Sequence, residues 1–122
     1  MDNNTITPSL ENYLKTIYLL HKADSSVRLI DIAERMSVSK PSANRAVAEL
    51  SEKGFVEHEK FGPIRLTDQG IATAQKLLAK FDTIKRFLMN VLNLSEALAV
   101  SEACVLEHTI QDVTLNQMAS LI

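Results

Sequence analysis

The first half of the chain carries the apolar pattern of two short consecutive helices. In residues 29–36, apolar side chains recur at i, i+3, i+4 and i+7, the spacing of one buried helical face. Pro41 disfavours a helical conformation at the residue before it and suits the first turn of a new helix, for which Ser39 is the candidate N-cap. The pattern therefore predicts a second helix that begins near Pro41 and ends at Gly54, in the manner of a C′ glycine.

Beyond this second helix the pattern becomes that of two short strands. Residues 55–60 and 64–66 are strand-like, and the residues between them, Phe61, Gly62 and Pro63, are typical of a turn, which predicts a β-hairpin. Residues 27–28 are expected to add a brief third strand beside it. Helix, tight turn, helix and hairpin in this order predict a winged helix-turn-helix, whose second helix enters the major groove of DNA.

Further helical patterns flank this region on both sides. Thr7 is the expected N-cap of an amphipathic helix that completes the helix-turn-helix core. Thr67 is the expected cap of a helix of about 24 residues, roughly 36 Å long, which exceeds the width of a winged-helix domain. Ser95 starts a further helix, expected to continue to Ile110, and a last amphipathic segment begins near Val113. Apolar helices at this end favour a dimer interface.

The polar residues around the start of the second helix have the chemistry of a DNA-binding face. Lys40 and Arg45 can contact phosphate or guanine, and Asn44 can pair with adenine through two hydrogen bonds. His58 is interpreted as a wing residue near phosphate. The candidate DNA-binding residues are Arg28, Ser39, Lys40, Pro41, Ser42, Asn44, Arg45 and Lys60. Taken singly, each is explained equally well as a solvated surface residue, but their clustering at a helix N-terminus favours DNA.

Composition narrows the class of function. A chain of 122 residues with 46% hydrophobic residues can bury a core without metal or disulfide support. A formal net charge of −2 argues against binding nucleic acid by bulk charge, so any DNA contact has to come from a local basic patch. Because no apolar run approaches a membrane span of ~20 residues and no signal peptide is evident, we expect a cytoplasmic protein without a membrane partner. The single Cys104 fits a reducing compartment and leaves structural, metal-ligand and redox roles open.

Several motifs occur together and in order: SLENYLKTIYLL, VR-x-x-DIAE, VS-x-P-S, KG, LT-x-x-G and ACVLEH. In this combination, over nearly its whole length, the chain resembles the diphtheria toxin repressor family of metal-dependent transcription repressors, which includes the manganese transport regulators. The resemblance implies a mainly α protein, with a winged helix-turn-helix domain over residues 1–70 and a helical metal-binding and dimerisation region over residues 71–122. It also implies a homodimer that binds a palindromic operator in double-stranded DNA, in the short form without an SH3-like domain.

The resemblance further implies a divalent transition metal, with Fe²⁺ or Mn²⁺ favoured and Zn²⁺, Co²⁺ or Ni²⁺ as alternatives. The implied metal ligands are Cys104, Glu107, His108 and Asn12. Three of them are spaced at i, i+3 and i+4, which would place them on one helical face. However, Lys15 stands where the manganese regulators have a ligand Glu, and Phe81 stands where the family has a ligand His. These departures leave either one mononuclear site or no working site.

Other functions are weighed against this one. A winged-helix regulator with a degenerate metal site could respond instead to thiol oxidation at Cys104, to another ligand, or to nothing. An enzyme with Cys104 as nucleophile and His108 as base is disfavoured, because no orienting group or oxyanion-hole motif accompanies them. A purely structural or interaction module would lack a positive recognition face. We therefore expect a DNA-binding regulator and not an enzyme.

Overall fold

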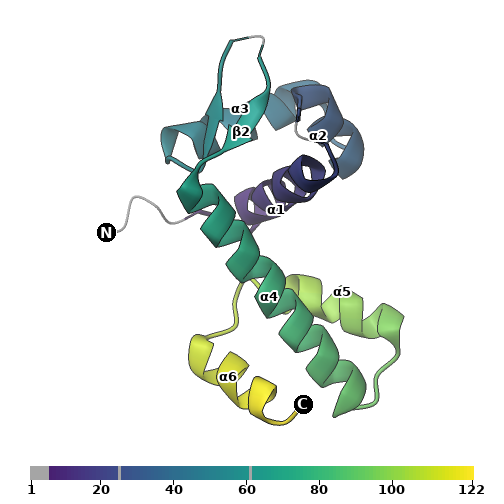
Figure 1. The fold of residues 1–122 in the computed structure, drawn as a ribbon. Helices are drawn as coiled ribbons and strands as arrows, with labels where there is room; N and C mark the ends of the chain where they lie inside the picture. The colour runs from purple at the N-terminus through teal and green to yellow at the C-terminus, as the bar shows by residue number, and fades with distance from the viewer. Residues whose placement is uncertain (1–5, 25, 61) are drawn as a thin grey trace. The chain divides into compact units, whose positions relative to one another are not determined.

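The structure, a computed structural model, describes residues 6–24, 26–60 and 62–122. Its elements in chain order are α1 (Pro8–Ala23), α2 (Leu29–Met36), α3 (Lys40–Glu52), β1 (Val56–His58), β2 (Ile64–Leu66), α4 (Asp68–Asn90), α5 (Glu96–Leu106) and α6 (Asp112–Ser120) (Figure 1). This confirms the predicted mainly α fold with one small hairpin. Among the helices that these residues form, none has the length and apolar character needed to cross a membrane.

The chain divides into two compact units, one ending at Gln75 and the other beginning at Lys76. The long helix α4 starts in the first unit and continues into the second, as its length of 23 residues requires. The sequence places the domain boundary at residues 70 and 71, in the first turn of this helix. Each unit has its own core and is described by itself below.

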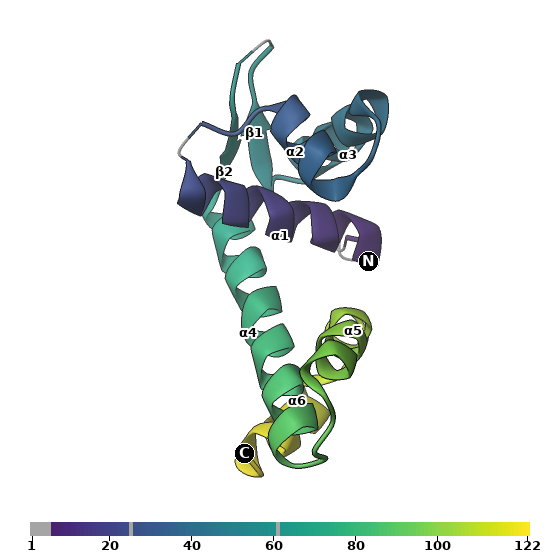
Figure 2. The same ribbon diagram turned by 90° about the vertical axis from the view of Figure 1, so that its right-hand side faces the viewer.

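In the first unit, α1 supports the helix-turn-helix from one side. Both views show α2, α3 and the hairpin above α1, which contacts α2, α3 and β2 (Figures 1 and 2). The buried residues of this core are Leu10, Tyr13, Leu14, Ile17, Val27, Ile32, Ala33, Ala43, Ala46, Val47, Leu50, Phe55, Val56, Ile64 and Ala74. They come from every element of the unit, so the predicted role of α1 in completing the core is confirmed.

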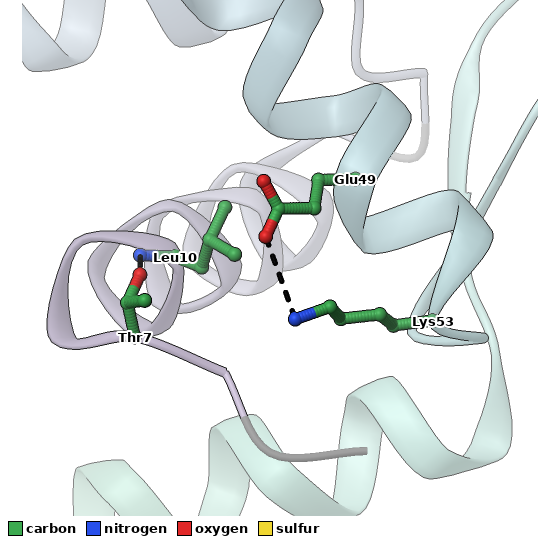
Figure 3. A network of polar contacts seen from close by, with 4 residues as sticks. All are labelled: Thr7, Leu10, Glu49 and Lys53. Atoms are coloured by element: carbon green, nitrogen blue, oxygen red, sulfur yellow. Dashed lines mark hydrogen bonds and ion pairs between the residues drawn. The ribbon is translucent and has the colours of Figure 1, made fainter. Parts of the chain in front are cut away.

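Side-chain caps fix where α1 and α3 begin. The Thr7 hydroxyl oxygen accepts a hydrogen bond from the Leu10 backbone N–H at 3.2 Å (Figure 3). At the start of α3, the Ser39 hydroxyl oxygen accepts from the Ser42 backbone N–H, also at 3.2 Å. Each cap satisfies an amide that has no partner within its helix, and a proline in the first turn reinforces each start. Both predicted helix starts are therefore confirmed.

The end of α3 is also locally determined. On its last turn Glu49 and Lys53 form an ion pair at 3.4 Å, which Figure 3 shows. Lys53 is the C-cap, and Gly54 follows with φ of +88°, a left-handed conformation that is costly for residues with a Cβ atom. The predicted C′ glycine is confirmed, and the chain turns there into the wing.

The wing is a short antiparallel hairpin. Its register pairs Val56 with Leu66 and His58 with Ile64, so the strands are shorter than the predicted segment 55–60. Phe61, which was assigned to the turn, lies outside the described residues. The predicted third strand is present as one bridge, in which the Ile64 backbone N–H donates to the Val27 carbonyl oxygen at 2.7 Å.

Thr67 joins the base of the wing to α4. Its hydroxyl donates to the Gly54 carbonyl oxygen at 2.7 Å, while the Gly70 backbone N–H donates to the same hydroxyl at 3.1 Å. The Thr67 backbone N–H donates to the Phe55 carbonyl oxygen at 3.1 Å. These bonds confirm Thr67 as the helix cap. They bring α4 so close to Phe55 that a Cβ atom on Gly70 would lie 2.0 Å from that carbonyl oxygen.

The second unit has a smaller core, formed where α5 packs on the later part of α4. Its buried residues are Ile84, Leu88, Ala99 and Ala103. Asn93, with φ of +58°, follows α4, and the Ser95 hydroxyl caps α5 by accepting from the Leu98 backbone N–H at 3.2 Å. Both features agree with the predicted break and restart of the helix.

The expected extent of α5 was wrong. The helix ends at Leu106 and does not continue to Ile110. Its buried face is made by the small residues Ala99 and Ala103, whereas the larger Leu98 and Val105 are exposed. The physical reason is that apolar residues surround α5 on all sides, so that periodicity alone could not identify the face that packs.

The second unit exposes many of its large apolar side chains. In α6, which begins near the predicted position, no residue is buried. The exposed large hydrophobic residues of this unit are Leu92, Leu98, Val105, Val113, Leu121 and Ile122. We call this set the exposed apolar residues of the second unit.

Candidate functional site

A groove of about 820 Å³ opens in the first unit where the starts of α2 and α3 approach the wing. It is lined by Arg28, Leu29, Ile30, Lys40, Pro41, Asn44, His58, Lys60 and Gly62. The structure thus brings together residues from three separate elements, including five of the eight predicted DNA-binding residues. We call this surface the recognition groove.

The recognition groove is positively charged. Arg28 stands at the N-cap of α2, Lys40 is the first residue of α3, and Lys60 follows β1. All three are exposed, and no acidic side chain is among the described residues that line the groove. The N-terminus of α3 adds the partial positive charge of the helix dipole. A chain of net charge −2 therefore carries the local basic patch that the sequence analysis required.

Asn44 is the residue of the groove best suited to reading a base. It lies one turn into α3, directly after Ala43, whose complete burial fixes how the helix is rotated about its axis. Asn44 is exposed, and its amide carries one acceptor and two donor hydrogens, as the edge of adenine requires.

The other three predicted DNA-binding residues do not line the groove. The Ser39 hydroxyl accepts from the Ser42 backbone N–H and donates to the Ser42 hydroxyl oxygen at 2.8 Å, so its first role is to start α3. Arg45 is exposed on α3, outside the groove lining. DNA contacts by these residues stay predictions.

The groove also contains residues that sequence reasoning left out. His58 was placed near phosphate and lines the groove, but Leu29, Ile30 and Gly62 were not singled out for DNA binding. Leu29 packs against the core, so its contribution is structural. Ile30 is different, because it is an apolar residue beside the periodic stripe of α2, and this irregularity was visible in the sequence.

The predicted metal ligands are distributed over both units. Glu107, the C-cap of α5, is only 1% exposed, and its Oε1 atom lies 3.6 Å from Nε2 of His108. The His108 side chain is 6% exposed. Cys104 is exposed on α5, and Asn12 lies on α1 in the first unit.

The described residues do not assemble a complete metal shell. Across residues 6–24, 26–60 and 62–122, no group of three His, Cys, Asp or Glu side chains is placed to hold a metal ion. The C-cap of α5, Glu107, keeps a helical backbone conformation and its N–H donates to the Ala103 carbonyl oxygen at 3.0 Å, so the placement of the candidate ligands on one helical face stays a prediction. Glu107 and His108 together offer one carboxylate and one imidazole, and a complete transition-metal shell would need further protein ligands.

Lys15 and Phe81 stand at two positions where the family resemblance implies metal ligands. Lys15 is half-buried on α1, and Phe81 is a partly buried residue that packs against the core of the second unit. A phenyl ring used for packing cannot supply a nitrogen to a metal ion, so this position contributes hydrophobic contacts in place of a ligand.

Family models match almost the entire chain. The model described as iron dependent repressor, N-terminal DNA binding domain, matches residues 5–62. The model described as iron dependent repressor, metal binding and dimerisation domain, matches residues 67–122. The chain belongs to the iron-dependent repressor family. Its members are DNA-binding transcriptional regulators, which confirms the family resemblance and the expectation that the chain is not an enzyme.

Individual relatives agree with this family. The chain is 34% identical to an uncharacterized HTH-type transcriptional regulator of Methanocaldococcus jannaschii, over 93% of this chain and 91% of that protein. It is 28% identical to the HTH-type transcriptional regulator MntR of Lysinibacillus sphaericus, over 95% of this chain and 83% of that protein.

Among solved structures, the manganese regulator SloR matches with a TM-score of 0.81 and 38% identity. The match covers 95% of this chain and 54% of that chain, so this iron-dependent repressor homologue spans about half the length of that regulator. The correspondence confirms the winged helix-turn-helix fold followed by a helical region.

Proposed function

We propose that this chain is a homodimeric transcriptional repressor that binds a palindromic operator through the recognition groove. The observation that carries the proposal is the convergence of Arg28, Lys40, Asn44 and Lys60 on one groove from α2, α3 and the end of β1. The family match to a DNA-binding domain supports the same surface.

The groove residues divide the work of recognition by their chemistry. Arg28, Lys40 and Lys60 neutralise phosphates and release counterions, which supplies affinity without sequence preference. Asn44, at the start of α3, reads adenine in the major groove, where each base pair has a distinct pattern of donors and acceptors. The wing contacts the backbone beside the recognition helix.

The second unit supplies the dimer contact in this proposal. Its exposed apolar residues include Val105, at 67%, and Val113, at 64%. A second copy of the chain would cover such side chains, and the matching family domain is a metal-binding and dimerisation domain. A two-fold dimer presents two α3 helices to half-sites about 34 Å apart.

The proposed signal is a divalent cation, Fe²⁺ or Mn²⁺. Carboxylate and imidazole are ligands that both ions accept, and Glu107 and His108 hold these groups adjacent and buried. Cys104 and Asn12 are the further candidate donors. The alternative signal is oxidation of Cys104, which is favoured by the exposure of this thiol.

DNA binding is tested by selecting duplexes from a randomised library and measuring affinity by fluorescence anisotropy at several salt concentrations. We expect Lys40→Ala with Lys60→Ala to weaken binding and to reduce the slope of log affinity against log salt by about 2. The matched control is Lys22→Ala with Arg35→Ala, which removes two exposed charges outside the groove lining and should change the slope less. Equal slopes in both double variants, or no binding above the non-specific level, would exclude the proposal.

The signal is tested on the same operator with Mn²⁺, with Fe²⁺ under anaerobic conditions, and with chelator. We expect the metals to strengthen binding by at least about tenfold, and Glu107→Gln to remove this gain. Alkylation of Cys104 with and without metal reports whether its thiol takes part, since a coordinated thiolate reacts slowly. Equal DNA binding with metal and chelator excludes the cation, and a change on oxidation that Cys104→Ser abolishes supports the thiol.

A further inference from the structure

Ile30 is a large aliphatic side chain held at the surface of the recognition groove. It is 52% exposed and is absent from the buried cluster and its packed neighbours in the first unit. The preceding residue, Leu29, also lines the groove, but it packs against the core. A single exposed isoleucine is common on protein surfaces. Its position here is informative, because it lines the same groove as the three cations proposed to meet phosphate and the Asn44 amide proposed to meet a base.

The chemistry of duplex DNA limits what an aliphatic group in this position can contact. The phosphates are matched by Arg28, Lys40 and Lys60, and the polar base edges by Asn44. In the major groove the apolar group that distinguishes one base pair from another is the 5-methyl group of thymine. Covering this methyl group with the Ile30 side chain removes apolar surface of both partners from water.

We infer that Ile30 is a specificity residue that reads the 5-methyl group of a thymine in each half-site, beside the position read by Asn44. This inference rests on the proposed function, because it requires the recognition groove to hold DNA. It adds a selective contact from α2, the helix that otherwise crosses the DNA backbone. It also explains why an isoleucine with no core partner lines a cationic groove.

A sequence-neutral role for Ile30 is the main competing explanation. An aliphatic side chain near the backbone can pack against deoxyribose, and this contact is the same for every base. The two roles differ in one observable. A sugar contact is indifferent to the removal of a methyl group from a base, whereas the proposed contact depends on it.

The experiment is a cycle that combines a protein change with a DNA change. After selection of an operator with the wild-type protein, each thymine is replaced in turn by deoxyuridine, which lacks only the 5-methyl group. We expect one pair of symmetry-related thymines, one in each half-site, at which the replacement weakens wild-type binding by about three- to fivefold per half-site. Ile30→Ala should lose this penalty, and Ile30→Val should keep part of it. Leu19→Ala, which shortens an exposed leucine of α1 outside the groove lining, should retain the full wild-type penalty.

The outcomes separate the inference from the function on which it rests. If Ile30→Ala weakens binding to the thymine and uracil duplexes equally, the contact is to sugar and the inference is overturned. If the penalty at every position is the same in Ile30→Ala and wild type, the methyl group is read elsewhere and the inference is again overturned. If no selected duplex binds above the non-specific level, the proposed function fails first. Circular dichroism of each variant checks that the exposed substitutions leave the fold intact.

Discussion

The two units of the chain treat their apolar residues in opposite ways. The first buries large side chains from α1, α2, α3 and both strands in one core and turns Arg28, Lys40 and Lys60 outward. The second buries Ile84 and Leu88 against two alanines and leaves the six exposed apolar residues of the second unit at the surface. The difference teaches that the first unit is complete by itself and has a surface suited to a polyanion. The second has a surface suited to another protein chain.

This contrast has an energetic side. Burying a valine or leucine side chain fully stabilises a structure by about 1.5–3 kcal/mol. Burying several exposed ones in an interface would therefore favour association strongly. In the first unit, burial of apolar side chains stabilises the fold itself. In the second, further stabilisation is gained when a partner covers the exposed apolar residues. Substitutions should therefore act on stability in the first unit and on assembly in the second.

The largest expected effect is on the first unit, in Gly70→Ala. Helix propensity alone favours alanine by about 1 kcal/mol at this helical position. However, the added Cβ atom would lie 2.0 Å from the Phe55 carbonyl oxygen, and this backbone atom cannot move without disturbing the base of the wing. We expect the free energy of unfolding to fall by about 3 kcal/mol. Urea denaturation followed by circular dichroism measures this change.

The reverse substitution nearby is the control for Gly70→Ala. Ala72→Gly, at an exposed position of the same helix, should cost only the propensity difference of about 1 kcal/mol. If Gly70→Ala proves as stable as wild type, the close packing of α4 against the wing is refuted.

The next effect is on the second unit, where a charge placed among the exposed apolar residues should prevent association. We expect Val105→Lys and Val113→Lys to raise the dimer dissociation constant by at least about tenfold, because an unpaired ammonium is costly to bury. The helical content of the monomer should not change. Sedimentation equilibrium measures the constant, and Leu19→Lys on α1 is the control. A dimer that tolerates both lysines would show that the interface lies elsewhere.

The sequence predicted the helix boundaries of the first unit better than those of the second. The starts of α1, α3 and α4 depend on Thr7, Ser39 and Thr67, whose hydroxyls each accept from the backbone N–H three residues later, so local reasoning identified them correctly. The predicted end of α5 was wrong, because the chain turns after Leu106 through i−3 hydrogen bonds from His108 and Thr109, and no Gly or Pro in the sequence marks that turn. The face of α5 that packs was also not identifiable from periodicity. That choice is made by contacts distant in the sequence.

The candidate sites show the same limit. The recognition groove could be predicted in outline because Lys40, Pro41 and Asn44 follow one another at a helix start. Ile30 was not singled out, because the sequence does not show that it lines one groove with residues of α3 and the wing. The metal site stays a prediction, because the described residues bring Glu107 and His108 together but contain no group of three ligands placed to hold a metal ion.

The third prediction sharpens the distinction between affinity and base reading in the first unit. Asn44→Ala should reduce affinity for the selected operator by about 1–3 kcal/mol and relax its preference at one position per half-site. Its affinity for non-specific DNA should hardly change, because the amide carries no charge. Competition binding with operators altered at each position measures both quantities. A uniform loss across all sequences would instead assign Asn44 to the backbone.

The smallest effect concerns Ser39, whose hydroxyl starts α3 and was also predicted to meet phosphate. Ser39→Ala should lower the free energy of unfolding by about 1 kcal/mol, because the Ser42 amide loses its acceptor. Ser39→Asp restores an acceptor and places a negative charge near the helix N-terminus, so stability should return to within about 0.5 kcal/mol of wild type. For DNA affinity the order of the two variants reverses. We expect Ser39→Asp to bind DNA more weakly than Ser39→Ala, because a carboxylate repels phosphate. Denaturation and anisotropy on the same three proteins therefore separate the two roles, and an Ala variant as stable as wild type would remove the capping role.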